Sequence, residues 1–140
     1  MITDFYAIDE VFEKLNSNVD FKNEFKGVIY RLTSPDSQTD EYCVINVLTM
    51  VGNQLKEAVL NVNVYVPNLT IQINGRQDSS QPNVNRLRLL NELLEQSLSG
   101  VWKPNAYLID VRSGTTMQDP TKRMHFINKR IDFKKFNITE

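Results

Sequence analysis

The sequence predicts an α+β fold, with helices packed on one face of a mainly antiparallel sheet. Two segments, 4–16 and 84–99, repeat apolar residues every three or four positions, which is the spacing of one helix face. Other segments alternate apolar and polar residues, which is typical of strands with one buried face. The expected order is helix, three strands, helix, two strands. A length of 140 residues suits a single domain over 1–140.

The first helix is predicted over residues 4–16, and the chain just after it is ambiguous. Thr3 is a suitable N-cap, and the polar run 16–18 ends the helical pattern. Residues 19–25 leave open whether one further helical turn follows. Four apolar side chains share one face of the first helix: Phe5, Ile8, Phe12 and Leu15.

Three strands are predicted next, over 27–33, 41–51 and 58–66, and the third is the clearest element in the sequence. Short connections between them predict an antiparallel meander. Asn61 and Asn63 on the second face of the third strand indicate that this face is partly hydrated. The residues expected to share one face of each strand are Val28, Tyr30 and Leu32, then Cys43, Ile45, Val47 and Val51, then Ala58, Leu60, Val62, Val64 and Val66.

A long polar loop is predicted over 67–83, and loops of this length in small domains are usually functional or disordered. The second helix follows the loop, with Gly100 placed to end it. Two more strands are predicted over 105–112 and 122–135, separated by another loop, and residues 136–140 are expected to be a frayed tail. Four leucines form the apolar stripe of the second helix: Leu87, Leu90, Leu94 and Leu98.

No group of residues predicts catalysis, a metal site or a cofactor site. The single histidine, His125, lies in the middle of a predicted strand, and the chain has no nucleophile motif. The single cysteine, Cys43, lies among apolar residues and is expected to be buried. The carboxylates have no spacing typical of an acid–base pair, and the five glycines are isolated, which excludes a phosphate-binding loop. We therefore expect a protein that is not an enzyme and needs no cofactor.

The charged residues are balanced overall but unevenly distributed. The formal net charge is −1, whereas proteins that mainly bind duplex DNA are usually far more basic. Residues 1–25 contain six acidic and two basic residues, and residues 121–140 contain six basic and two acidic residues. These blocks are either solvated surfaces or a contact between the acidic helix of one subunit and the basic strand of the next. The second interpretation gives these interface candidates: Glu10, Glu13, Lys129, Lys134 and Lys135.

The basic C-terminal strand has a further interpretation as a nucleic-acid groove. Three phenylalanines lie near its basic residues, Phe126, Phe133 and Phe136, and aromatic rings of this kind can stack on bases. Most of these positions are also needed for the hydrophobic core of the domain. We therefore keep nucleic-acid binding as an alternative to the interpretations based on subunit contacts.

The predicted long loop contains apolar residues at every second position, Leu69, Ile71 and Ile73. They either extend the third strand past Pro67 or form a projecting β-arm that pairs with another subunit. The length of the loop favours a role in interaction. We expect interface contacts at these three residues and at Arg76.

Three segments carry a resemblance to a known family: 61–67 (NVNVYVP), 85–90 (NRLRLL) and 125–133 (HFINKRIDF). Together with the order of the predicted elements, they make the chain similar to the tail-terminator, or tail-completion, proteins. These small proteins join head and tail in long-tailed phages and prophages. The likeness extends over nearly the whole chain.

The resemblance implies a structural protein without catalytic activity or cofactor. It implies a ring, commonly of six subunits, that caps the tail tube and docks onto the head connector, while nucleic acid passes through only transiently. Such a protein assembles in the host cytoplasm and then belongs to the virion. In agreement, the N-terminal residues lack a signal-peptide pattern and no apolar segment reaches membrane-spanning length. The alternative function is a small nucleic-acid or nucleotide-binding module that uses the basic C-terminal strand, and a hydrolase that uses His125 is a weaker third hypothesis.

Overall fold

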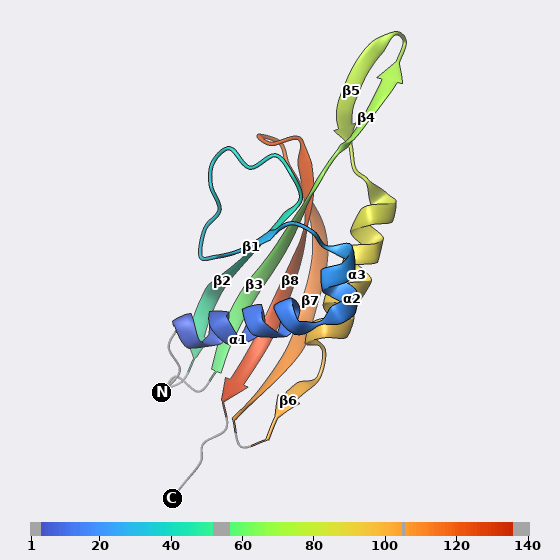
Figure 1. Ribbon diagram of the computed structural model, residues 1–140. Helices are drawn as coiled ribbons and strands as arrows, with labels where there is room; N and C mark the ends of the chain where they lie inside the picture. The colour runs from blue at the N-terminus through green and yellow to red at the C-terminus, as the bar shows by residue number, and fades with distance from the viewer. Residues whose placement is uncertain (1–3, 52–56, 105, 136–140) are drawn as a thin grey trace, which may run out of the picture.

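A computed structural model describes residues 4–51, 57–104 and 106–135, and it confirms the α+β class. In chain order the elements are α1 (Asp4–Ser17), α2 (Val19–Glu24), β1 (Val28–Arg31), β2 (Tyr42–Val51), β3 (Glu57–Pro67), β4 (Leu69–Ile73), β5 (Arg76–Gln81), α3 (Val84–Leu98), β6 (Val101–Lys103), β7 (Tyr107–Asp119) and β8 (Met124–Lys135). The described residues form a six-stranded sheet in the order β1-β2-β3-β8-β7-β6 and a separate β4-β5 hairpin. The three helices lie on one face of the large sheet (Figure 1).

The first two strands run parallel, so the predicted antiparallel meander is wrong at this edge of the sheet. β1 pairs with β2 in the register Val28↔Tyr42 to Arg31↔Ile45, and the other neighbours in the large sheet are antiparallel. Parallel neighbours need a connection that carries the chain back along the sheet. The segment between Arg31 and Tyr42 provides this connection, and Leu32 leaves the strand with a φ of 79°.

In β1 the residue that faces the core is not one of those expected to share a face, and in α1 the expected face is confirmed except at Phe5. Ile29 faces the core with 9% exposure, whereas Val28 is 53% exposed. The pairing of Ile29 with Cys43 explains this, because cross-strand partners share a face and Cys43 is fully buried. In α1, Phe5 is 59% exposed and lies in the first turn, at the edge of the buried stripe. The fully buried residues of that stripe are Ala7, Ile8, Val11 and Leu15.

The predicted core faces of the third strand and of the second helix are confirmed. Asn83 caps α3, because its side chain accepts a hydrogen bond from the backbone N–H of Arg86 at 3.2 Å. Gly100, with a φ of 64°, follows the end of the helix. Burial of this apolar surface holds α3 on the sheet. The confirmed core residues are Ala58, Leu60, Val62, Val64, Val66, Leu87, Leu90, Leu94 and Leu98.

The sheet face opposite the helices carries a hydrogen-bonded row of asparagines. The side chain of Asn61 donates to Asn46 at 3.2 Å, and Asn128 donates to Asn61 at 3.2 Å and to Asn63 at 2.6 Å. Asn61 and Asn63 are half-buried, as expected for a partly hydrated face. Their amides satisfy one another across β2, β3 and β8, which removes the cost of burying polar groups.

Most of the predicted loop 67–83 is instead a β-hairpin. β4 and β5 pair antiparallel around Asn74 and Gly75, whose φ values are 52° and 75°. Positive φ at both central residues is the geometry of a type I′ turn, which Asn-Gly favours. β4 follows β3 after Asn68 and runs on from it, but it pairs with β5 in a separate two-stranded sheet, and this hairpin projects as an arm from one end of the molecule (Figure 1).

The strand predicted over 105–112 is longer than expected. β7 continues through the predicted loop to Asp119 and pairs with β8 from Tyr107 to that end, with a bulge at Arg112. The short strand β6 was not predicted, and it pairs with Tyr107 to Ile109 only. The expected tail 136–140 lies outside the described residues. None of the described helices has the length and apolarity to cross a membrane.

Candidate functional site

The projecting hairpin presents the apolar residues that the sequence analysis selected. Leu69, Ile71 and Ile73 are 41%, 36% and 45% exposed, and every residue of β4 is exposed. Arg76, the first residue of β5, is exposed as well. A strand with alternating exposed apolar side chains and a free edge is a typical surface for pairing with another chain.

The base of the hairpin is fixed to the main sheet by Asn68 and His125. The backbone N–H of Asn68 donates to the carbonyl of Arg123 at 3.1 Å, and its side-chain amide donates to the carbonyl of Ser79 at 2.9 Å. The Nδ1 atom of His125 lies 2.6 Å from Oδ1 of Asn68, within hydrogen-bonding distance. His125 therefore has a structural contact at the joint between arm and sheet.

The outer edge of β7 is a second surface suited to strand pairing. Beyond Ile109, β7 pairs with β8 on one side, and no strand among the described residues pairs with the other side. Residues 112–118 are all exposed, and the stretch 113–118 contains no charged residue and no proline. Because natural proteins usually protect free edges with such residues, this edge is a candidate interaction surface.

A groove of about 390 Å³ runs between α3 and this part of β7. Val84 and Leu87 line it on the helix side, and Val84 is 51% exposed although it is apolar. Gly114 and Thr116 line it on the sheet side. Its volume is sufficient for the side chains of a bound segment.

Lys129 is also part of this groove, but it is not a surface residue. It is 5% exposed, and its Nζ atom donates to Oε2 of Glu95 on α3 at 3.1 Å. Its side chain crosses over Gly114, where an added methyl group would come within 2.8 Å of Nζ. A buried ammonium group needs a partner, and this ion pair joins α3 to the sheet. Lys129 is therefore engaged inside the subunit, in the wall of the groove, and its contact with a neighbouring subunit stays a prediction.

The other charged candidates lie near α1 and the end of β8. Within one chain, Glu10 accepts a hydrogen bond from the Tyr107 hydroxyl at 2.9 Å, and Nζ of Lys135 lies 5.4 Å from the centre of the Tyr6 ring. Glu10 thus contacts β7, and the end of β8 contacts α1 through Lys135 and Tyr6, inside the subunit. Two members of the set remain on the exposed surface, Glu13 and Lys134, and their contact with a neighbour stays a prediction.

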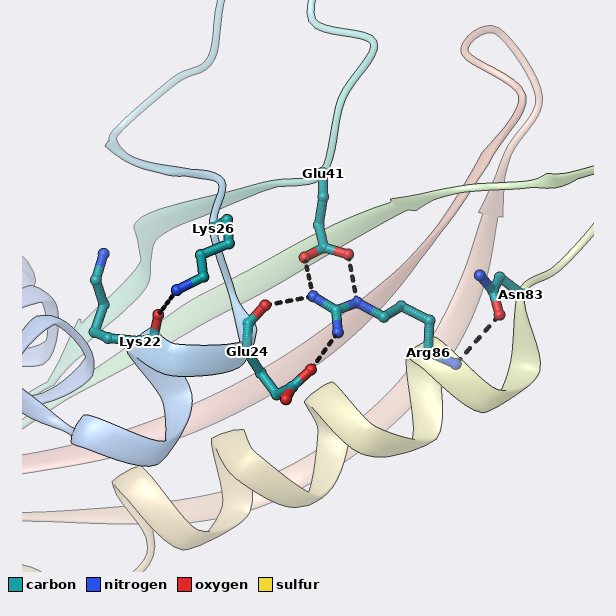
Figure 2. Close-up of polar contacts among 6 residues, drawn as sticks. All are labelled: Lys22, Glu24, Lys26, Glu41, Asn83 and Arg86. Atoms are coloured by element: carbon teal, nitrogen blue, oxygen red, sulfur yellow. Dashed lines mark hydrogen bonds and ion pairs between the residues drawn. The ribbon is translucent and has the colours of Figure 1, made fainter.

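A charged cluster that the sequence analysis missed joins three elements (Figure 2). Arg86 on α3 donates to both carboxylate oxygens of Glu41, at 2.9 and 2.8 Å. It also donates to the carboxylate and the backbone carbonyl of Glu24, at 2.8 and 2.6 Å. The hydrogen bonds to Glu41 and then to Glu24 raise the pKa of Arg86 above its ordinary value. Because these partners occupy the guanidinium, the cluster is a structural tie and not an open anion site.

An aromatic row lies on the open face of the sheet. The ring centres of Tyr42 and Tyr65 are 4.5 Å apart, and those of Tyr65 and Phe126 are 4.7 Å apart, both in stacked geometry. Nζ of Lys122 lies 5.2 Å from the centre of the Tyr42 ring and donates to its hydroxyl at 2.9 Å. Burial raises the pKa of Tyr65 to about 12. The row is part of the packing of the sheet.

The described residues contain no group of three or more His, Cys, Asp or Glu side chains that could hold a metal ion. Cys43 is fully buried, as predicted, and burial raises the pKa of its thiol well above the ordinary value. A thiol in this environment is protonated at neutral pH and is a poor nucleophile. That the protein is not an enzyme stays a prediction.

Comparison with known proteins finds a likeness in structure but none in sequence. No protein-family model and no curated protein sequence matches the chain. A solved structure with the same fold is a chain from the virion of a native gene transfer agent particle, with a TM-score of 0.61 and 11% sequence identity. The likeness covers 93% of this chain and 98% of that chain. It shows that the two chains share a fold over nearly their whole length.

Proposed function

We propose that the protein is a structural component of a phage-like virion and that it acts by assembly. The observation that carries this proposal is the fold shared with a chain of the gene transfer agent virion, over 93% and 98% of the two chains. The exposed arm β4 and the unprotected edge of β7 support it, because both surfaces suit strand pairing between chains. The protein would then need no catalytic group and no cofactor.

Within that class, we infer a tail terminator at the head–tail junction. The resemblance in segments 61–67, 85–90 and 125–133 supports this finer assignment. A body with an arm at one end also suits head-to-tail contacts between copies, which close into rings when the rotation permits. The partners would be copies of the same chain in a ring, commonly of six, with the tail tube on one side and the head connector on the other. Nucleic acid would only pass through the ring.

The alternative function, nucleic-acid binding by the basic C-terminal strand, has less support from the contacts. Phe126 is stacked on Tyr65, and Phe133 is fully buried in the core. Phe136 lies outside the described residues. Lys129 is bound to Glu95, so the strand presents fewer free cations than its sequence suggests.

Deletion of the gene from the phage or prophage that encodes it tests the proposal. We expect heads and tails that remain unjoined in electron micrographs, and joined particles when the intact gene is supplied in trans. A tagged copy that restores joining should be located at the head–tail junction by gold labelling. Normal joined particles in the deletion strain would contradict the proposal.

A further inference from the structure

We propose that the groove between α3 and the free edge of β7 is the docking site for β4 of a neighbouring copy of this chain. The inference rests on the proposed function, because it describes the contact that would build the ring. β4 would pair along β7 as an added strand, and its alternate apolar side chains would enter the groove. One chain carries both halves of this contact, at different places on its surface.

The edge of β7 has the length and the chemistry to accept β4. Its stretch 113–118 has six uncharged residues, and the five residues of β4, Leu69 to Ile73, are also uncharged. At about 3.4 Å per residue, β4 spans about 17 Å and fits within that stretch. Backbone hydrogen bonds along such an edge supply affinity, whereas pockets for alternate side chains supply specificity.

The groove lies on the side of the sheet where those side chains would be placed. Gly114 pairs with Lys129 and Thr116 with Ile127, so both β7 residues lie on the face that the helices cover. An added strand continues this face, and every second residue of β4 would point toward α3. There, Val84 and Leu87 form the apolar part of a wall that also contains Arg88 and Asn91. Covering the half-exposed Val84 with a leucine or isoleucine of the neighbour removes apolar surface from water.

The arm fits a second copy and not its own chain. β5 returns from the tip to Gln81, and the next residue, Pro82, already lines the groove. The hairpin points away from the large sheet, so β4 does not reach back along β7 of the same chain (Figure 1). Arm and groove are different surfaces, which makes the contact head-to-tail. Each subunit would donate one arm and accept one, as a closed ring requires.

Cysteine cross-linking tests this contact directly. Ile71→Cys and Val84→Cys are made in separate chains, and the native thiol of Cys43 is buried. Mixing the two proteins under mild oxidation should give a disulfide-linked dimer, and both substitutions in one chain should give a ladder of larger covalent oligomers. Gln72→Cys mixed with Val84→Cys is the matched control, because Gln72 adjoins Ile71 and points to the opposite face of the hairpin. Equal cross-linking in the control would overturn the proposed register.

A charge placed in the groove tests the same contact without oxidation. Val84→Glu should weaken self-association by about tenfold or more, whereas Leu89→Glu should not, because Leu89 is 38% exposed on the same helix but does not line the groove. Sedimentation at several concentrations measures the association, and the melting temperature shows that both variants fold. If the protein forms an oligomer that neither cross-links nor weakens with Val84→Glu, the proposed docking site is wrong, but the proposed ring is not contradicted. A chain that stays monomeric at every concentration overturns both.

Discussion

Arg86 binds Glu41 through two parallel hydrogen bonds, with N–O distances of 2.9 and 2.8 Å, and this pair joins the first turn of α3 to the start of β2. The side chains are 25% and 18% exposed, so each would be poorly hydrated without the other. A third partner, Glu24, adds the end of α2. The cluster therefore fixes α3, which forms one wall of the groove, against α2 and the start of β2 (Figure 2).

We expect Arg86→Lys to lower the free energy of unfolding by about 1–3 kcal/mol, because a lysine cannot make the paired hydrogen bonds and leaves Glu41 partly unsatisfied. Urea denaturation measures the change. Arg31→Lys is the control, since the Arg31–Asp9 pair is more than half exposed on both sides and such pairs contribute less than about 1 kcal/mol. Similar losses in the two variants would contradict the role given to Arg86.

Gly27 lies against the backbone of Glu41, where a Cβ atom would overlap the carbonyl oxygen. Backbone atoms cannot move aside as a flexible side chain can. We therefore expect Gly27→Ala to separate β1 from β2 and to lower the free energy of unfolding by about 1–3 kcal/mol. Lys26→Ala, at the exposed neighbouring position, should change it by less than about 0.5 kcal/mol. A Gly27→Ala variant as stable as the parent would show that the two strands are not in this close contact.

The thiol of Cys43 should not react with a thiol reagent while the protein is folded. It is fully buried, and burial raises its pKa, so neither the thiolate nor access for the reagent is present at neutral pH. Reaction should occur only through unfolding, and it should become complete in denaturant. Rapid labelling of the native protein would contradict the burial of β2 and would also remove the basis of the cross-linking design.

Tyr65 should make the free energy of unfolding depend on pH in the alkaline range. Burial, with smaller contributions from Tyr42 and Asp119, raises its pKa to about 12, whereas an unfolded tyrosine ionises at about 10. Below about pH 10 the free energy of unfolding is unaffected by this group. Between about pH 10 and 12 it should fall, because the unfolded chain releases the phenol proton first. The difference in ultraviolet absorbance between the parent and Tyr65→Phe follows the ionisation, and a midpoint near pH 10 would contradict the burial of Tyr65.

Strong periodicity is the part of the fold that could be predicted. In β3, alternate residues from Ala58 to Val66 are buried, and in α3 the four leucines from Leu87 to Leu98 are buried. Each pattern extends over several repeats, so a single residue that departs from it does not change which face is predicted to be buried. The positions of Cys43 in the core and of Gly100 after α3 follow from equally local signals.

Short elements and long-range pairing could not be predicted in the same way. β1 has four residues with apolar side chains at adjacent positions, Val28 and Ile29, so its own sequence does not choose a face. The pairing with the parallel neighbour β2 determines which face of β1 is buried. The hairpin had one local signal, Asn74-Gly75, but the polar residues of β5 hid the strand beside it. The extension of β7 depends on pairing with β8, which no single segment reveals.

The candidate site could be predicted in part. Leu69, Ile71 and Ile73 stand out because alternating apolar residues in a polar segment need a partner. The groove cannot be recognised in the sequence, since it exists only where α3 is packed across β7 and β8. Some charged residues expected at a subunit contact instead have partners inside the chain, as the pairing of Lys129 with Glu95 illustrates. Those partners lie far apart in sequence.

The molecular mass of the purified protein in solution, measured by sedimentation over a wide range of concentrations, shows whether the chain assembles through its β4 arm. We expect a discrete larger species whose mass is a whole multiple of the 16.2 kDa subunit and whose fraction rises with concentration. Ile71→Lys should return this species toward the subunit mass, whereas Gln72→Lys should not. A single species of 16.2 kDa at every concentration, unchanged by either substitution, would contradict assembly through the β4 arm.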